Sequence, residues 1–245
     1  MIDLLAIVAH PDDAELNVAG TLLKQADRGG AFAIVDLTRG ERGTRGSAKL
    51  RAQEMSAANA VLGIDDTRRW NLEIPDGGIT RTDEHVERVV RAIRYFRPET
   101  VIFPWKEDRH PDHQDAHLLV HRSLFESGLT ARVTEHDGHT QAPYRPARSY
   151  CFFHTYETTP SLLVDITDQF ERKLDAVAAY ESQFTLPGRS NRFDSDQPET
   201  FISGADYLEA LIARMRHWGF MGGVRYAEAF ITLNGPVVVP VLAGG

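Results

Sequence analysis

The sequence of 245 residues contains one cysteine, Cys151, so an intrachain disulfide is impossible. The apolar neighbours in "SYCFFH" indicate that this cysteine is a small buried side chain. A block of basic residues is also missing: the net charge is -8, and 27 Lys and Arg residues are spread along the chain among 35 acids. A nucleic-acid binder needs a concentrated basic footprint, so we expect no nucleic-acid partner.

Long hydrophobic runs are absent too. No apolar run approaches the roughly 20 residues that a membrane-spanning helix needs, so we expect no membrane partner. The first residues, "MIDLLAIVAH", carry an acid at position 3 and no cationic region, which is not the pattern of a signal peptide. These features favour a cytoplasmic protein, and a hydrophobic content of 42% is sufficient for a sizeable core.

The first half of the sequence alternates apolar runs of strand length with segments of helical period. Strands are expected at 3–9, 31–37, 67–72 and 100–105, and helices at 14–28, 48–62, 83–96 and from 111 onward. Ser47 is a plausible N-cap and Gly63 a plausible helix terminator. This order predicts an α/β protein with a Rossmann-like, doubly wound, mostly parallel sheet and helices on both faces.

The second half is less regular, and we expect an irregular C-terminal extension within one domain spanning 1–245. Two polar connections, 131–148 and 181–200, are long enough to be functional loops, and the second could contribute a lid. Strands are expected at 148–154, 161–166 and 227–233, and helices at 168–182 and 205–218.

Two apolar runs end in the same way, in His-Pro-Asp: "LLAIVAHPDDAEL" and "TVIFPWKEDRHPDHQDAH". In the common strand order 3-2-1-4-5 the first and fourth strands are neighbours, and ligands bind beyond their carboxyl ends. Pro11 and Pro111 are expected at the first position of the following helices. Asp12, Asp13 and Asp112 would then lie in first helical turns, where the helix dipole favours ionised carboxylates.

His10, Asp13 and His113 together offer two imidazoles and a carboxylate. This set matches catalytic zinc, which takes three protein ligands, keeps one position for water and lowers the pKa of that water to about 7. Spacing alone does not decide whether Asp12 or Asp13 binds the metal, and it does not exclude Glu15.

Two groups remain for acid–base work. Asp12 could accept a proton from water, and His110 could stabilise the developing oxyanion or protonate the leaving group. Asp112 could orient His110 through the second ring nitrogen of that histidine.

At these residues the sequence resembles the LmbE/PIG-L family of zinc-dependent N-acetylglucosaminyl deacetylases. "AHPDDAE" is similar to the first motif of the family and "HPDH" to the second. The resemblance implies an N-deacetylase in which His10, Asp13 and His113 bind zinc and Asp12 is the general base. It also implies that His110 is the transition-state stabiliser or general acid.

Further segments resemble the branch that deacetylates GlcNAc-malate in bacillithiol biosynthesis, namely "LTRGERGTRGS", "NLEIPDGGI", "SLLVDIT", "AYESQF" and "RYAEAF". The resemblance implies a small-molecule N-acetyl sugar substrate bound by Arg51 and Asp76. Arg109 could bind the malate carboxylate, or pair with Asp108 or Glu107. Resemblance to oligomeric family members and the apolar "GPVVVPVLAGG" lead us to expect a homo-oligomer, with a hexamer as one form.

Three other functions compete with this interpretation. A nucleotide-binding protein would carry G-x-G-x-x-G in its first strand-to-helix turn, where this chain carries acids. A non-catalytic sugar-binding relative would have lost a ligand or the base, and none is missing. An amidase of a thiol conjugate would use the same chemistry.

The remaining histidines are weaker candidates. His154 ends a strand and could reach the crevice. His117 and His121 are expected to be structural, and His136 and His139 to be solvated loop residues.

Overall fold

Seven strands form the central sheet, in the order β3-β2-β1-β4-β7-β9-β8. The computed structural model of this chain describes residues 1–185 and 197–233. The strands are β1 (Ile2–Val8), β2 (Phe32–Asp36), β3 (Arg69–Asn71), β4 (Pro98–Pro104), β7 (Arg148–Phe152), β8 (Leu162–Asp165) and β9 (Ala227–Thr232). Pairing is parallel from β3 through β7, whereas β9 pairs antiparallel with both β7 and β8. The predicted doubly wound α/β fold is confirmed, and β1 and β4 are neighbours.

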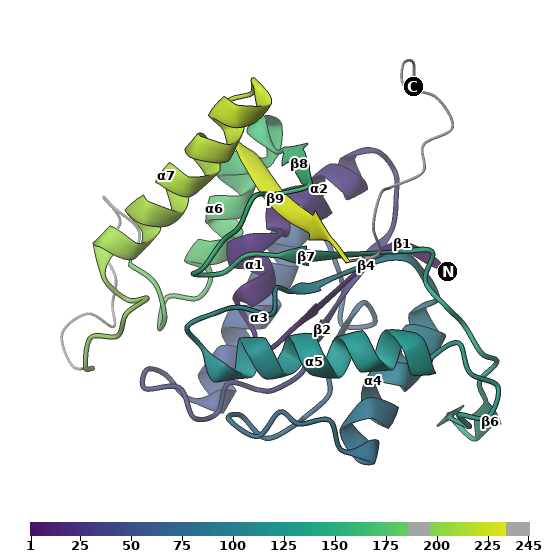
Figure 1. Cartoon of the computed structure of the whole chain (residues 1–245). Coiled ribbons are helices and arrows are strands. Elements are labelled where there is room, and N and C mark those ends of the chain that lie inside the picture. Colours follow the sequence, from purple (N-terminus) through teal and green to yellow (C-terminus); the bar gives the residue numbers. More distant parts are fainter. Residues whose placement is uncertain (186–196, 234–245) are drawn as a thin grey trace.

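Helices cover both faces of this sheet (Figure 1). They are α1 (Asp13–Asn17), α2 (Ala19–Asp27), α3 (Ala48–Leu62), α4 (Asp83–Phe96), α5 (Pro111–Glu126), α6 (Phe170–Ala178) and α7 (Ala205–Gly222). The residues of β1 alternate between the two layers because successive side chains of a strand point to opposite faces. Leu5 and Ile7 pack with α4 and α5, whereas Leu4, Ala6 and Val8 pack with α1, α2 and α6.

The helix predicted at 14–28 is divided into α1 and α2 at Val18, whose φ of -134° is not helical. A carboxylate from a distant strand occupies the N-terminus of α2. Glu228 in β9 accepts the backbone N–H groups of Gly20 and Thr21 at 2.9 and 2.8 Å, and pairs with the buried Lys173. These bonds supply acceptors for N–H groups that the helix itself leaves unpaired, and they fasten β9 to α2.

Other helix boundaries follow the sequence signals. The Ser47 side chain accepts the N–H of Leu50, and Gly63 follows α3 with a φ of 74°. Helix α4 spans the residues predicted for it. The polar segment 131–148 contains a small hairpin, β5 (Glu135–His136) and β6 (His139–Thr140).

In the second half, a short 3-10 turn (Thr167–Gln169) precedes α6, which is shorter than the predicted 168–182. Most of the expected lid, residues 186–196, lies outside the described residues, as does the apolar 235–245 segment. A search of the described helices for one long and apolar enough to cross a membrane finds no candidate.

Candidate active site

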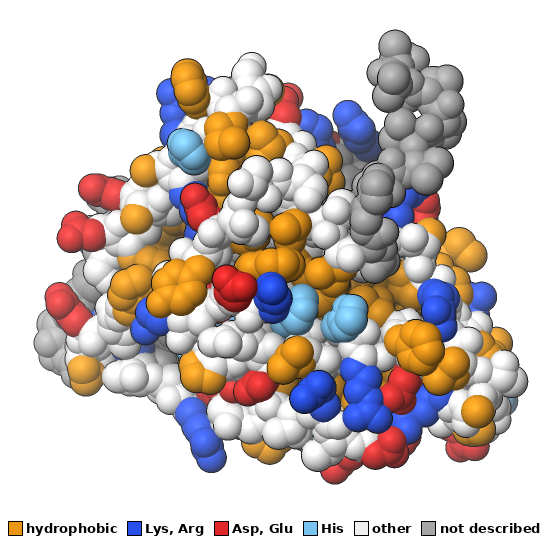
Figure 2. All heavy atoms as spheres, viewed as in Figure 1, with side chains coloured by type: hydrophobic (Ala, Val, Ile, Leu, Met, Phe, Trp, Pro, Cys, Tyr) orange, Lys and Arg blue, Asp and Glu red, His pale blue; other side chains and the backbone are white. Residues whose placement is uncertain are grey.

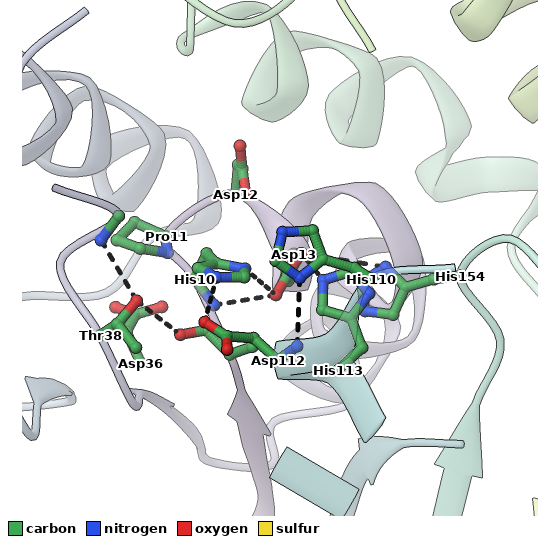
Figure 3. A network of polar contacts seen from close by, with 12 residues as sticks. His10, Pro11, Asp12, Asp13, Asp36, Thr38, His110, Asp112, His113 and His154 are labelled. Atoms are coloured by element: carbon green, nitrogen blue, oxygen red, sulfur yellow. Dashed lines mark hydrogen bonds and ion pairs between the residues drawn. The ribbon is translucent and has the colours of Figure 1, made fainter. Parts of the chain in front are cut away.

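A cavity of about 460 Å³ opens at the carboxyl ends of β1 and β4. Both His-Pro-Asp segments contribute to it, as the strand order predicts. Figure 3 shows their side chains converging from the two strand ends. The cavity wall carries most of the polar candidates and two aromatic residues, among them His10, Asp12, Asp13, Arg42, Arg51, Asp76, Asp108, Arg109, His110, His113, His154, Phe201 and Tyr207.

The first segment turns more sharply than a helix start requires. Pro11 was predicted to be the first residue of the helix, and this is wrong. Asp12 follows it as the N-cap of α1, with a φ of 113°. An L-residue rarely adopts such a positive φ, and it costs about 1–3 kcal/mol. The turn separates two adjacent carboxylates: the Asp12 side chain points away from the cluster that Asp13 joins (Figure 3).

The second segment follows the predicted pattern more closely. Pro111 is the first residue of α5 and His110 is the N-cap. The backbone N–H of Asp112 donates to Nδ1 of His110 at 3.2 Å. Because Nδ1 accepts this bond, a neutral His110 carries its proton on Nε2, and burial lowers the pKa of this imidazole.

The structure corrects the contact expected for Asp112. Its carboxylate does not orient His110: one oxygen lies 3.2 Å from Nε2 of His10 and accepts the backbone N–H of Gly77 at 2.8 Å. The helix start explains the difference, because the backbone N–H of Asp112, not its side chain, faces His110.

His10, Asp13 and His113 bring three potential ligand atoms within 4.8 Å of one another. One Asp13 oxygen lies 3.5 Å from Nδ1 of His10, and the other lies 3.4 Å from Nε2 of His113. Asp13 therefore lies between the two imidazoles. His10, His110 and Asp112 form a second group of three by the same distance criterion.

Each imidazole of the first group faces Asp13 with one ring nitrogen and another carboxylate with the second. Nδ1 of His113 lies 2.9 Å from Asp108, which also accepts the N–H groups of His110 and Thr155. Nε2 of His10 lies 3.3 Å from Asp76 in addition to Asp112. Carboxylates commonly orient metal-binding histidines in this manner. Asp108 was expected only as a partner for Arg109, and its contact with His113 had no signal in the sequence.

The electrostatics of this group favour a cation. Burial lowers the pKa of His10, but hydrogen bonds with Asp112, Asp13 and Asp76 outweigh burial and raise it well above its ordinary value. Burial also lowers the pKa of His113, whereas Asp13 and Asp108 raise it, to about 9. The carboxylates thus require positive charge between them, supplied by protons or by a metal ion. Two imidazoles and a carboxylate with this surplus of acids suit a zinc ion bound by three protein ligands.

Asp12 has a different environment. Its side chain is 5% exposed, and Nη1 of Arg51 donates to it at 2.9 Å. Burial raises the pKa of Asp12 against the opposing effect of Arg51, and the result is about 7. A carboxyl group with this pKa can exchange a proton near neutral pH.

Glu15, which the sequence did not exclude as a ligand, is withdrawn from the cavity. Its side chain is fully buried and lies 2.5 Å from Nη1 of Arg69. Asp36 binds Nε of the same guanidinium at 2.8 Å, and Asn59 accepts from Nη1 at 3.1 Å. We refer to Glu15, Asp36 and Arg69 as the sealed cluster.

The three predicted substrate residues all line the cavity. Asp76 accepts the backbone N–H of Arg42 at 2.8 Å through one oxygen and faces His10 with the other. The Arg109 guanidinium lies 4.2 Å from the centroid of the Phe201 ring, and it is not paired with Asp108 or Glu107 among the described residues. Arg51 contacts Asp12, as described above.

His154 belongs to the site, which the sequence left undecided. Its ring stacks on His113 with centroids 3.7 Å apart, and its Nδ1 lies 2.9 Å from the side-chain nitrogen of Asn17. That amide also donates to the backbone oxygen of Asp13, which fixes its orientation, so Nδ1 of His154 accepts. Burial lowers the pKa of His154 to about 3, and its neutral ring therefore carries the proton on Nε2. Asn17 and His154 thus brace two of the three predicted ligands.

Three other wall residues were not named as candidates from the sequence. Phe201 and Tyr207 come from the region at the start of α7, distant in sequence from both motifs, and Arg42 comes from the loop after β2. Only the packing of α7 over the crevice brings the two aromatic residues to the cavity.

The remaining histidines lie elsewhere. His117 is buried, with Nδ1 2.9 Å from the backbone oxygen of Pro104, and its ring stacks on His121. His136 is not simply a solvated loop residue, because it stacks on Trp70 with centroids 5.3 Å apart. His139 is exposed in β6.

Comparison with known proteins identifies relatives along most of the chain. The PIG-L family model, described as GlcNAc-PI de-N-acetylase, matches residues 5–124. Diacetylchitobiose deacetylase from Thermococcus kodakarensis is 29% identical, covering 92% of this chain and 80% of its own length. A probable N-acetyl-alpha-D-glucosaminyl L-malate deacetylase 2 from Bacillus anthracis is 28% identical, covering 74% of this chain and 81% of its own. The crystal structure of the conserved protein TT1542 from Thermus thermophilus superposes with a TM-score of 0.85 at 35% identity, covering 100% of both chains.

Proposed function

Since this chain belongs to the PIG-L/LmbE family of N-deacetylases, we propose that it removes the acetyl group from GlcNAc-malate with a zinc ion held by His10, Asp13 and His113. Deacetylation of an N-acetylated amino-sugar compound is the activity in the names of three relatives. One observation supports the assignment most strongly: the three ligand atoms lie together, and the neighbouring Asp12 lines the same cavity.

The residues of the chain have distinct tasks in this reaction. His10, Asp13 and His113 would hold the zinc ion, which would supply Lewis-acid chemistry for attack on the amide. Asp12, whose pKa is raised to about 7, accepts the proton of the attacking water. His110 presents its Nε2–H as a hydrogen-bond donor to the charge that develops on the reacting amide. The proton that Asp12 takes from water is then passed to the leaving amine. Asp108 orients the imidazole of His113, and Asp112 orients that of His10.

Arg51, Asp76 and Arg109 remain our proposed substrate contacts. Arg109 is the proposed partner of the malate carboxylate because its guanidinium lines the cavity and, among described residues, has only the Phe201 ring as a charge-stabilising neighbour. An Arg109→Met variant should raise KM for GlcNAc-malate more than KM for an uncharged N-acetyl sugar. An equal change for both substrates would remove Arg109 from the specificity site.

Two measurements test the proposed function. Acetate release, followed by mass spectrometry, should give a higher kcat/KM for GlcNAc-malate than for N-acetylglucosamine or diacetylchitobiose. Preference for diacetylchitobiose would assign the chain to a different substrate, and cleavage of a thiol conjugate's amide instead would favour the amidase alternative.

Metal content provides an independent measurement. Elemental analysis should find about one zinc ion per chain in the purified protein and little in His113→Ala. Full metal content in that variant would remove His113 from the ligand set.

We also propose that the chain forms a homo-oligomer, with a hexamer as one form. Phe220 and Met221 at the end of α7 are 84% and 53% exposed, and hydrophobic side chains gather on the molecular face above α5 (Figure 2). Burying such surface between subunits is favourable. Light scattering at micromolar concentration should give a multiple of 27.4 kDa, and a mass of 27.4 kDa would contradict the proposal.

A further inference from the structure

Asp12 adopts an unfavourable backbone conformation, and no capping hydrogen bond to its own helix compensates for it. Its φ of 113° lies in a region that L-residues avoid, and its side chain makes no capping hydrogen bond to α1 although aspartate is a favoured N-cap. The side chain is instead directed into the cavity. Such a residue keeps its conformation only when surrounding groups hold it there.

Arg51 is placed to supply that restraint. Its Nη1 donates to the backbone oxygen of Pro11 at 2.6 Å and to Oδ2 of Asp12 at 2.9 Å. One nitrogen therefore binds on both sides of the φ torsion of Asp12: the peptide before it and the side chain after it. Among the described residues, Arg51 is the only side chain that donates a hydrogen bond to the Asp12 carboxylate.

The Arg51 guanidinium is largely buried beside the Pro11–Asp12 turn. Its side chain is 7% exposed and extends from the first turn of α3, which Ser47 caps. A Cβ added at Gly40, whose φ is 62°, would lie 3.5 Å from Nη1 of Arg51 and 3.7 Å from Cδ of Pro11. The loop at Gly40 therefore lies beside both partners, at a distance that even an added Cβ would keep as ordinary contact.

We propose that Arg51 is a positioning residue that holds the Pro11–Asp12 turn and directs the Asp12 carboxylate into the cavity, and that this is its main contribution to the reaction. This inference rests on the proposed role of Asp12 as the base. It differs from the expectation that Arg51 mainly binds the sugar, because a binding residue contributes to KM whereas a residue that positions the base contributes to kcat.

The test uses Arg51→Met and Arg51→Lys, with Arg39→Met as the control. Arg39 lies in the loop after β2 but is 56% exposed and does not line the cavity. We expect Arg51→Met to lower kcat for deacetylation of N-acetylglucosamine about 10–100-fold, part of the contribution of a placed base, with KM changed less than threefold. Arg51→Lys, which keeps the charge and one donor, should recover part of kcat, and Arg39→Met should match the wild type. A KM raised more than tenfold with kcat retained would overturn the proposal.

A double-mutant comparison separates this inference from the proposed function. If Arg51 acts through Asp12, Arg51→Met should cause no further loss of kcat in an Asp12→Asn background. Independent, multiplying losses would contradict the positioning role while leaving Asp12 as the base. Normal activity of Asp12→Asn alone would overturn the proposed base, and the positioning role with it. Should Arg51→Met fail to fold, the Arg51→Lys variant alone or with Asp12→Asn gives the same comparison.

Discussion

The first turn of α1 supplies acids to two buried sites with opposite properties. Asp12 and Asp13 face the cavity, where carboxylates outnumber fixed cations and the pKa values of His10 and His113 are raised. Glu15, two residues later, joins the sealed cluster, where the Arg69 guanidinium contacts both carboxylates and every side chain is fully buried. In the sealed cluster one fixed guanidinium contacts both carboxylates, whereas the charge partners of Asp13 are the titratable imidazoles of His10 and His113. Burial alone therefore does not identify a functional carboxylate. The group that pairs with the carboxylate must be known as well.

The comparison is tested first by matched substitutions of its two acids. Asp12→Asn should lower kcat about 10²–10⁴-fold because the amide cannot accept a proton, while zinc content stays normal. Glu15→Gln should alter kcat of the folded fraction less than tenfold, because Glu15 does not reach the cavity. Steady-state kinetics with zinc analysis on the same samples measures both. Similar losses of kcat in the two variants would show that the clusters are not functionally separate.

The sealed cluster should contribute more to the free energy of unfolding than an exposed ion pair does. Arg69→Met leaves two buried carboxylates without their counterion, and we expect the free energy of unfolding to fall by about 3–5 kcal/mol. Arg148→Met, which breaks an exposed pair with Glu99, should cost less than about 1 kcal/mol. Urea denaturation monitored by circular dichroism gives both values. A loss below about 1 kcal/mol for Arg69→Met would mean that the cluster contributes little.

The titratable residues of the cavity, His113 and Asp12 among them, should make the stability of metal-free protein depend on pH. The pKa of His113 is raised to about 9, above the value of about 6.5 in an unfolded chain, so its contribution is complete below about pH 6.5 and is lost as pH rises through 9. Asp12 acts in the same direction, because its pKa of about 7 lets the folded chain keep a proton that the unfolded chain releases. We expect metal-free protein to lose on the order of 3 kcal/mol between pH 6.5 and 9.

This prediction is checked by denaturation of chelator-treated protein across that pH range. Zinc-loaded protein should lose less, because the metal replaces the protons. A metal-free protein whose stability rises with pH would contradict the assignment of raised imidazole pKa values.

The smallest effect concerns the carboxylate behind His113. Asp108→Asn should weaken zinc affinity about 10–100-fold, because the neutral amide orients the imidazole less strongly and no longer offsets its charge. Glu107→Gln is the matched control, since the Glu107 carboxylate is 67% exposed and, among the described residues, its one ion pair is with Lys106. Competition with a zinc chelator measures both affinities, and an unchanged affinity in Asp108→Asn would limit Asp108 to a local helix-start contact.

Local sequence signals were sufficient wherever one segment decided the outcome. Ser47 identified one helix start, and Pro111 identified another. Pro11 looked equivalent to Pro111 but is not, because the positive φ of Asp12 depends on Arg51 and the loop that packs against it. A motif cannot reveal a backbone conformation that another segment stabilises.

The sequence by itself determined the alternation of strands and helices and the presence of two acid- and histidine-rich turns at strand ends, because these follow from periodicity and local chemistry. It could not decide the partner of each charge, since the partners come from elements far apart in the chain. Only the tertiary structure separated Glu15 from Asp13 by supplying Arg69 from β3, and turned Asp112 toward His10. It likewise brought His154 from beyond β7 onto His113, and Arg51 from α3 onto Asp12. A buried charge takes its role from the groups that compensate it, and packing selects those groups.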